Sequence, residues 1–130
     1  MENKINWFEL RMAASIAASR AYAPYSGFKV GCAGLTDSGR IVTGCNVENA
    51  SYGLTLCAEC NMLGDLFAMG GGKIVAFICL NSEDEVIMPC GRCRQLLHEH
   101  ASQDFIMETP KGIATMADVL PLAFGREDLI

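Results

Sequence analysis

The sequence predicts an α/β protein, a three-layer α/β/α sandwich built around a mixed five-stranded sheet. The predicted elements follow the order helix, two strands, helix, strand, helix and two short strands, which places helices on both faces of a sheet. Residues 74–80 form a continuous apolar run, typical of a strand buried on both sides. With 130 residues and 51% hydrophobic composition, residues 1–130 are expected to form one domain that folds without disulfides.

The first element is predicted to be a helix that ends near residue 20. Asn6 and Glu9 have the spacing of an N-cap and a capping box. Apolar residues then recur at helical spacing: Phe8, Met12 and Ile16. Residues 23–27 contain proline and glycine and should end this helical region.

A β-hairpin is expected next. Residues 28–35 are rich in small apolar side chains, and residues 40–46 form a similar run. Residues 36–39, Thr-Asp-Ser-Gly, have turn composition between them. After a loop, residues 56–69 predict a second helix, which the glycines at 70–72 end.

The second half starts with the buried strand at 74–80, followed by an acidic turn. Pro89 suits a helix start, because its missing N–H costs nothing there, and the helix is predicted over 90–100. Two short strands, at 105–107 and 113–115, are expected before a short helix and turn over 117–124.

Composition limits the partners and the compartment. The net charge of -5 disfavours binding to nucleic acid, and no basic run suits a membrane surface. No apolar stretch is long enough to span a bilayer, and the first residues lack a signal-peptide core. Seven cysteines without a leader fit the reducing cytoplasm, with thiols free or bound to a metal. The high apolar content suggests that part of the surface is an oligomer interface.

Two Cys-x-x-Cys pairs carry the main functional signal: Cys57-Ala58-Glu59-Cys60 and Pro89-Cys90-Gly91-Arg92-Cys93. A glutamate two residues after a cysteine, followed later by Pro-Cys-x-x-Cys, matches the zinc deaminase signature. In this interpretation Cys57, Cys90 and Cys93 bind Zn²⁺, water takes the fourth position, and Glu59 moves protons. The cysteines would lie at helix N-termini, whose dipoles offset thiolate charge, and Arg92 and Arg94 are near enough in sequence to help.

Two other interpretations of the cysteines remain open. Cys60 lies on the same helical face as Cys57, so four thiolates could close a structural zinc site, although the gap between the pairs exceeds that of a zinc ribbon. Alternatively, the cysteines bind no metal and are small core residues. That second interpretation is adopted for the cysteines on predicted strands: Cys32, Cys45 and Cys79.

Longer stretches of sequence resemble the small homotetrameric cytidine deaminases. The similar segments run in order along nearly the whole chain: Tyr22-x-Pro24-Tyr25-Ser26-x-Phe28-x-Val30-Gly31, Asn46-Val47-Glu48-Asn49-Ala50-Ser51-Tyr52-Gly53, Cys57-Ala58-Glu59, Pro89-Cys90-Gly91-Arg92-Cys93-Arg94-Gln95 and Leu120-Pro121-x-Ala123-Phe124-Gly125. One position departs from the pattern, because many relatives have arginine where this chain has Cys60. That arginine would temper the charge of the ligand sulfurs.

The resemblance implies a set of substrate-binding residues. Asn46 and Glu48 would bind the ribose hydroxyls, and Phe28 would pack against the pyrimidine. The backbone of Ala58 and the region around Cys90 would hold the base and its amino group. Phe124 would reach into a neighbouring subunit's site, and Tyr52 would lie at a subunit boundary. Without the resemblance, these residues would be assigned to turns, core or surface.

The implied function is zinc-dependent hydrolytic deamination of cytidine and 2'-deoxycytidine to uridine and 2'-deoxyuridine plus ammonia, in pyrimidine salvage. Zinc-bound water would be the nucleophile and Glu59 the proton shuttle, in a homotetramer with active sites at subunit interfaces. Two further functions compete with this one. The chain could act on another aminopyrimidine, such as a cytosine-containing nucleoside antibiotic, or be a non-catalytic zinc module closed by Cys60. Editing of DNA or RNA is disfavoured by the acidic charge.

Overall fold

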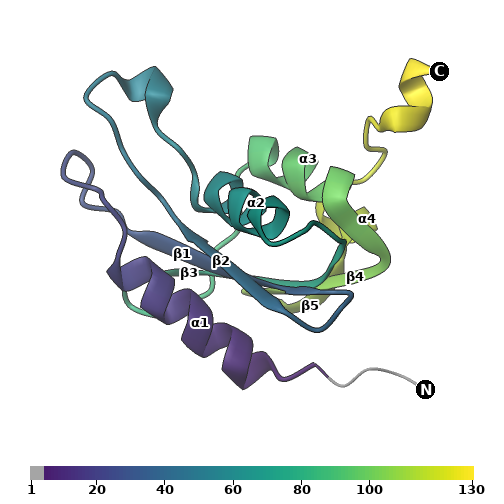
Figure 1. Cartoon of the computed structure of the whole chain (residues 1–130), viewed down its shortest axis with the longest axis horizontal. Helices are drawn as coiled ribbons and strands as arrows, with labels where there is room; N and C mark the ends of the chain where they lie inside the picture. Colours follow the sequence, from purple (N-terminus) through teal and green to yellow (C-terminus); the bar gives the residue numbers. More distant parts are fainter. Residues whose placement is uncertain (1–4) are drawn as a thin grey trace.

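A mixed five-stranded sheet in the order β2-β1-β3-β4-β5 runs through the middle of the molecule (Figure 1). The computed structural model describes residues 5–130. Its helices and strands are α1 (Trp7–Ser19), β1 (Val30–Thr36), β2 (Ile41–Cys45), α2 (Ala58–Ala68), β3 (Ile74–Asn81), α3 (Gly91–His100), β4 (Ala101–Thr109), β5 (Gly112–Thr115) and α4 (Met116–Val119). Short 3₁₀ turns cover Tyr52–Leu54 and Arg126–Leu129. The predicted fold class is confirmed.

The strand pairing explains why the apolar run at β3 is continuous. β1 pairs antiparallel with both β2 and β3, whereas β4 lies parallel to β3 and antiparallel to β5. β3 is therefore the central strand, flanked on both sides and covered on both faces. Its side chains alternate between the two faces, so successive residues enter different cores. The predicted hairpin between β1 and β2 is confirmed.

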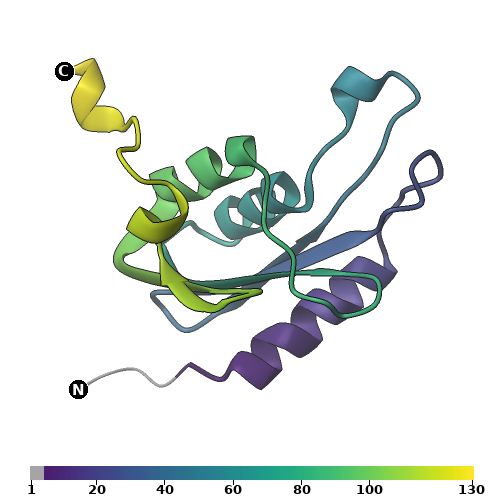
Figure 2. The same cartoon turned by 180° about the vertical axis from the view of Figure 1, so that it is seen from behind.

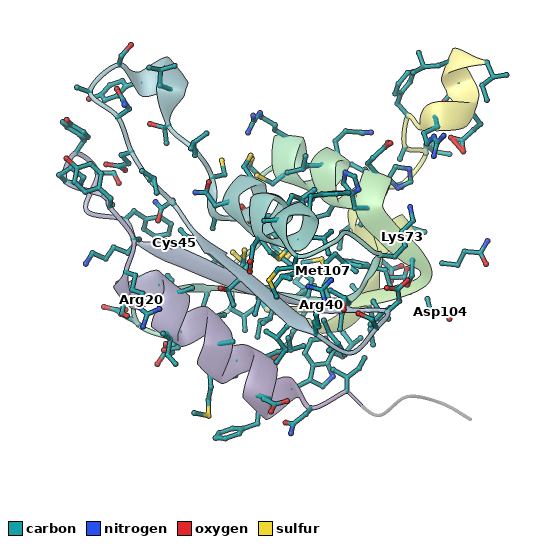
Figure 3. All side chains as sticks on the ribbon, in the orientation of Figure 1. Arg20, Arg40, Cys45, Lys73, Asp104 and Met107 are labelled. Carbon is teal, nitrogen blue, oxygen red and sulfur yellow. The ribbon has the colours of Figure 1, made fainter. Side chains whose placement is uncertain are left out.

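Helices cover both faces of the sheet (Figures 1 and 2). α1 lies on one face and α2 and α3 lie on the other. Side chains fill the space between each helix layer and the sheet (Figure 3). The α1 side buries a small, alanine-rich core: Leu10, Ala14, Ala33, Ala76, Ile78 and Leu80. The opposite core is larger and includes Met62, Leu66, Phe77, Cys79, Leu97 and Phe105.

The N-cap of α1 is confirmed, but the apolar residues that predicted the helix do not face the core. The Asn6 side chain accepts a hydrogen bond from the Glu9 backbone N–H at 3.1 Å; among the described residues, the Glu9 carboxylate returns no bond to Asn6. The exposed fractions of the large apolar side chains are high: Phe8 70%, Met12 49% and Ile16 51%. The buried face of α1 is instead made of Leu10 and three alanines, because the helix lies too close to the sheet for larger side chains.

Several element boundaries differ from the predicted ones. The fourth strand starts at Ala101, directly after α3, and not at residue 105. Ala101 pairs with Ile74 of β3, and the pairing is irregular until it resumes at Ile106. The predicted tail helix at 117–124 shortens to Met116–Val119, where Thr115 forms a capping box with Asp118. No helix within residues 5–130 is long and apolar enough to cross a membrane.

Gly44 on β2 lets the first turn of α2 lie directly on the sheet. A Cβ at this position would lie 2.2 Å from the Ala58 carbonyl oxygen and 2.4 Å from the Met62 nitrogen. We expect Gly44→Ala to lower the free energy of unfolding by about 1–3 kcal/mol, since backbone atoms must move to make room. Urea unfolding measures this change.

Gly64→Ala on α2 itself is the matched control. A Cβ at Gly64 meets nothing within 4 Å, so helix propensity should make this variant neutral or more stable by up to about 1 kcal/mol. Equal stability of the Gly44→Ala and Gly64→Ala proteins would show that α2 does not need this close approach.

Candidate metal centre

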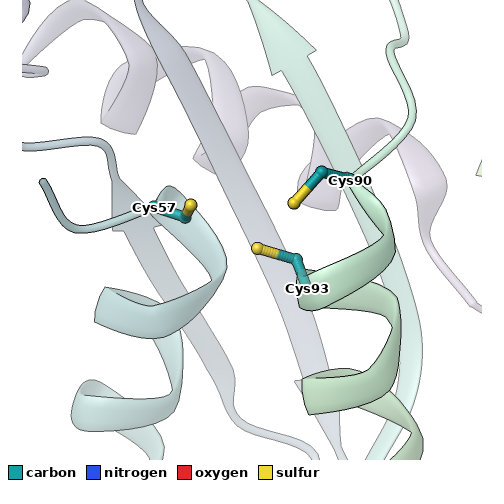
Figure 4. Close-up of side chains that lie close together, drawn as sticks. All are labelled: Cys57, Cys90 and Cys93. Carbon is teal, nitrogen blue, oxygen red and sulfur yellow. The ribbon is translucent and has the colours of Figure 1, made fainter. Parts of the chain in front are cut away.

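Three cysteine sulfurs converge between the N-terminal ends of α2 and α3 (Figure 4). Cys57 is the N-cap of α2, Cys90 is the N-cap of α3, and Cys93 lies in the first turn of α3. Their Sγ atoms all lie within 4.8 Å of one another, and within residues 5–130 they are the only such group of potential metal ligands. Tetrahedral zinc with thiolate bonds of about 2.3 Å places its sulfurs roughly 3.8 Å apart. The donor set therefore fits zinc.

The electrostatics of the three thiols also suit a divalent cation. Burial raises the pKa of Cys57 and Cys93, and the negative charge of Glu59 raises both further. The backbone N–H of Cys93 lowers the pKa of Cys90, which is exposed. A metal ion at this point would stabilise all three thiolates, and the N-terminal ends of both helices favour negative charge there. The predicted placement of the cysteines at helix starts is confirmed.

Glu59 lies beside the cysteines, in the first turn of α2, and is buried. Its exposed fraction is 4%, and no other charged side chain within residues 5–130 is classed as buried. The thiol of Cys79, on β3, donates a hydrogen bond to Glu59 Oε2 at 3.5 Å. Burying a carboxylate costs free energy, and buried carboxylates are common at functional sites. The position of Glu59 next to three thiols therefore indicates a functional site.

Cys60 belongs to a different set of contacts. Its sulfur is not part of the three-cysteine group, and it accepts a hydrogen bond from Arg92 Nη1 at 3.3 Å. The same Arg92 nitrogen lies 4.0 Å from Cys57 Sγ. The structure thus favours a site with three thiolates over one closed by Cys60. It also brings the Arg92 guanidinium, from α3, close to the sulfurs of Cys57 and Cys60.

Arg94 does not share this task. Its Nε donates to the Pro89 carbonyl at 2.8 Å, and its Nη1 donates to the Val119 carbonyl at 3.2 Å. Of the two arginines that the sequence places near the cysteines, Arg92 therefore contacts a cysteine sulfur, whereas the hydrogen bonds of Arg94 go to backbone carbonyls. Arg94 instead ties the loop before α3 to α4.

A cavity of about 200 Å³ opens beside the three cysteines. Three of the residues expected from the resemblance line it: Phe28, Asn46 and Ala58. Thr55, Cys79 and residues 87–89 line it as well. A larger cavity of about 750 Å³ lies between α1 and the sheet, but none of the three cysteines lines it. Because all three cysteines line the smaller cavity, we assign it as the candidate site.

The Asn46 side chain links the two strands that frame this cavity. Its Oδ1 accepts a hydrogen bond from the Val30 N–H, and its Nδ2 donates to the Phe28 carbonyl, both at 2.9 Å. The amide retains one N–H and one lone pair for a ligand. Asn46 thus fixes the backbone at Phe28 and still has hydrogen-bonding capacity.

Glu48 and Tyr52 line a neighbouring cavity of about 360 Å³, which Thr55 shares with the first one. The Glu48 carboxylate accepts hydrogen bonds from the Tyr25 N–H at 2.9 Å, from the Ser26 N–H at 3.1 Å and from the Ser26 hydroxyl. The Ser26 hydroxyl is the main cause that lowers the pKa of Glu48, so this carboxylate is ionised at neutral pH. Tyr52 is 78% exposed and packs edge-on against Tyr25.

Phe124 is not brought to either cavity within one chain. It lies in the C-terminal segment beyond α4, with its side chain 56% exposed, and its carbonyl accepts a hydrogen bond from Gln95 Nε2 at 2.8 Å. In Figure 1 this segment extends away from the body of the molecule. Within one chain, both Phe124 and Tyr52 therefore remain largely exposed.

Sequence reasoning missed two side chains of this site. Cys79 is assigned from sequence to the core, and it is 1% exposed, yet it also lines the cavity and contacts Glu59. Its position on the central strand, facing the helix layer that carries the cysteines, is the signal that could have identified it. Thr55 precedes the first cysteine pair, and nothing in its local sequence distinguishes it from other loop threonines.

The contact of Arg92 gives a direct prediction about metal affinity. We expect Arg92→Ala to weaken zinc binding about 10–100-fold, because a residue that hydrogen-bonds a ligand sulfur tunes its basicity and its charge. Competition with a chromogenic chelator measures the affinity. Arg20→Ala removes an exposed arginine at the end of α1 and should leave zinc binding unchanged. Equal affinities in the two variants would mean that the Arg92 guanidinium has no influence on the site.

Comparison with known proteins shows the same combination of fold and motif. Residues 5–109 match the family described as the cytidine and deoxycytidylate deaminase zinc-binding region. A cytidine deaminase of Mycobacterium tuberculosis is 51% identical over 125 residues, which cover 96% of this chain and 94% of that protein.

Solved structures agree with this match. The crystal structure of cytidine deaminase from Mycobacterium leprae has a TM-score of 0.88 at 54% identity, covering 91% of this chain and 99% of that one. The structure of cytidine deaminase from Mycobacterium tuberculosis has a TM-score of 0.90 at 51% identity, covering 94% and 99%. The matched family region contains all three clustered cysteines and Glu59.

Proposed function

Because the chain belongs to the cytidine and deoxycytidylate deaminases, a family of zinc-dependent enzymes, we propose that it hydrolyses cytidine and 2'-deoxycytidine to uridine and 2'-deoxyuridine plus ammonia. One observation carries the proposal. A buried carboxylate, Glu59, lies next to three converging cysteine thiols and lines the same cavity. A metal-activated water and a proton carrier would then reach the same bound substrate.

Cys57, Cys90 and Cys93 would hold the zinc ion. When bound, zinc supplies a Lewis acid that activates water at neutral pH. Glu59 would accept the proton of the attacking water and deliver it to the ring nitrogen N3. It would then take the proton of the new C4 hydroxyl and pass it to the amino group, which leaves as ammonia when the C4–N bond breaks. Its position in the cavity wall suits this role, because the carboxylate lines the same cavity as the three thiols.

The size of the cavity supports a single-ring substrate. Pockets that enclose drug-sized ligands are usually about 300–1,000 Å³, whereas this one measures about 200 Å³. A pyrimidine ring would lie against Phe28 and the backbone of Ala58, with its amino group toward the cysteines. The sugar would then extend past Asn46 and Thr55 toward the neighbouring cavity, and Asn46 and Glu48 would bind its hydroxyls.

The charge of the second cavity favours nucleosides over nucleotides. Glu48 is held ionised by its bonds to Ser26 and Tyr25. A phosphate on the sugar would approach this carboxylate and be repelled, and among residues 5–130 no arginine or lysine lines the cavity. The same charge supports the assignment of a free nucleoside as the substrate.

We propose that the substrate site is completed by residues of neighbouring copies of the chain. Tyr52 and Phe124 are exposed aromatic side chains that one chain leaves uncovered. In a homotetramer with active sites at subunit interfaces, Tyr52 would lie at a boundary and Phe124 would enter a neighbouring site. Light scattering at assay concentration tests this arrangement, and a fully active monomer would contradict it.

The proposal extends to the cellular role. We assign residues 1–130 to one catalytic domain that works in the cytoplasm, in pyrimidine salvage, without nucleic acid or membrane partners. The net charge of -5 supports the absence of a polynucleotide partner.

A comparison of substrates tests the proposed specificity. The zinc-loaded protein is mixed separately with cytidine, 2'-deoxycytidine, cytidine 5'-monophosphate and blasticidin S, and ammonia release is followed. We expect efficient turnover of both nucleosides and at least about 100-fold lower kcat/KM for the monophosphate. Preferred turnover of blasticidin S would identify a nucleoside-antibiotic deaminase, and equal turnover of the monophosphate would contradict the role assigned to Glu48.

A further inference from the structure

The thiol of Cys79 is placed to hold the carboxylate of Glu59. Cys79 lies on the central strand β3, and its Sγ donates to Glu59 Oε2 at 3.5 Å. Both side chains are buried, with exposed fractions of 1% for Cys79 and 4% for Glu59, and both line the cavity beside the clustered cysteines. The contact joins a rigid strand of the sheet to the first turn of α2.

Cys79 differs from the other thiols near Glu59 in what it can do. Cys57, Cys90 and Cys93 form the metal-ligand group, and a thiolate bound to a metal has no proton to donate. Cys79 is not in that group. Burial, with the nearby charge of Glu59, raises the pKa of Cys79 far above its ordinary value, so the thiol stays protonated. It remains a hydrogen-bond donor throughout the physiological pH range.

We propose that Cys79 is a positioning residue for the deamination reaction. Its S–H group fixes one oxygen of the Glu59 carboxylate and so orients the side chain toward the cavity. The inference rests on the proposed function, because it assigns to Cys79 the orientation of the proton shuttle. A general acid/base must be held within hydrogen-bonding reach of the reacting atoms, and a small misplacement lowers the rate.

Cys32 provides a matched control for packing. It is the direct cross-strand partner of Cys79 in the β1–β3 register and belongs to the same core. It is fully buried, at 0% exposure, yet it does not line the cavity and donates no hydrogen bond to Glu59 in the described part of the chain. Substitutions of Cys32 therefore reproduce the loss of a buried thiol from this core without the loss of the donor.

The experiment compares Cys79→Ala and Cys79→Ser with Cys32→Ala and Cys32→Ser. For each purified protein, the zinc content, kcat and KM for cytidine, and the affinity for a tetrahedral analogue of the hydrated nucleoside are measured. We expect Cys79→Ala to bind zinc normally, to lose about tenfold in kcat with KM nearly unchanged, and to bind the analogue about tenfold more weakly. Cys79→Ser retains a donor and should recover most of the rate, and both Cys32 variants should match the parent protein.

Three results would overturn the inference. They are a parental kcat in Cys79→Ala with zinc bound, an equal loss in Cys32→Ala, and a failure of serine to recover the rate. If Cys79→Ala does not fold, Cys79→Val fills the space without a donor and is expected to show the same loss in kcat.

The Glu59→Gln background separates this inference from the proposed function. There, adding Cys79→Ala should cause no further loss, because the oriented group is already absent. Rapid turnover by Glu59→Gln alone would reject the proton shuttle itself. Slow turnover by Glu59→Gln with a parental rate in Cys79→Ala would reject only the role of Cys79.

Discussion

Replacing Glu59 by glutamine is expected to lower the turnover of cytidine by roughly 10²–10⁴-fold, the usual contribution of a general acid/base, while zinc stays bound. Glutamine keeps the size of the side chain but can neither accept the proton of water nor return it to the pyrimidine. Because Glu59 is outside the group of clustered sulfurs, the metal ligands remain intact. Steady-state kinetics and metal analysis of the same preparation measure both effects.

Glu9→Gln is the control for this substitution. Glu9 also lies in the first turn of a helix, but it is exposed, and its helix, α1, covers the face of the sheet opposite α2 and α3 (Figure 1). Its substitution should leave the rate unchanged. A Glu59→Gln protein that turns over cytidine at the parental rate would exclude Glu59 as the proton carrier.

Cys57→Ala is expected to abolish both zinc binding and activity. Zinc in catalytic sites is held by three protein ligands, and two remaining thiolates do not retain it against a chelator. Metal analysis after dialysis against a weak chelator, followed by an activity assay, checks this expectation.

Cys60→Ala distinguishes an open site from a closed one. Cys60 lies three residues from Cys57 on α2 and accepts a hydrogen bond from Arg92, so its loss should leave zinc stoichiometric and most of the activity intact. Zinc K-edge spectroscopy of the parent protein should find three sulfur neighbours and one lighter atom. Four sulfur neighbours, or zinc loss in Cys60→Ala equal to that in Cys57→Ala, would establish a site closed by Cys60.

The fold could be predicted largely because local signals agreed with the tertiary structure. Each of these signals predicted an element directly beside it: the apolar run at 74–80 predicted β3, the glycines at 70–72 the end of α2, and Pro89 the start of α3. The orientation of α1 could not be predicted this way. Helical spacing identifies an apolar stripe, but the alanine face that packs on β1 depends on the close approach of α1 to Gly31, where a Cβ would lie 2.2 Å from the Ala14 carbonyl.

The site could be predicted where the residues of one motif lie on the same helix turn. Cys57 and Glu59 share a helix turn, and Cys90 and Cys93 share another, so two motifs placed four of the main groups. Side chains that meet across separate elements were not predictable. Arg92 and Arg94 are two residues apart and point to different sides of α3, and only the packing of α2 against α3 decides which one contacts the cysteines.

Zinc-dependent turnover of cytidine tests the central claim most directly. The protein is stripped of metal, titrated with zinc, and assayed at each step for the ultraviolet change of cytidine to uridine together with ammonia release. We predict that activity rises in proportion to bound zinc and levels off when every chain holds one ion at the group formed by Cys57, Cys90 and Cys93. Full zinc loading with no turnover of cytidine or 2'-deoxycytidine would contradict an open catalytic site for these nucleosides.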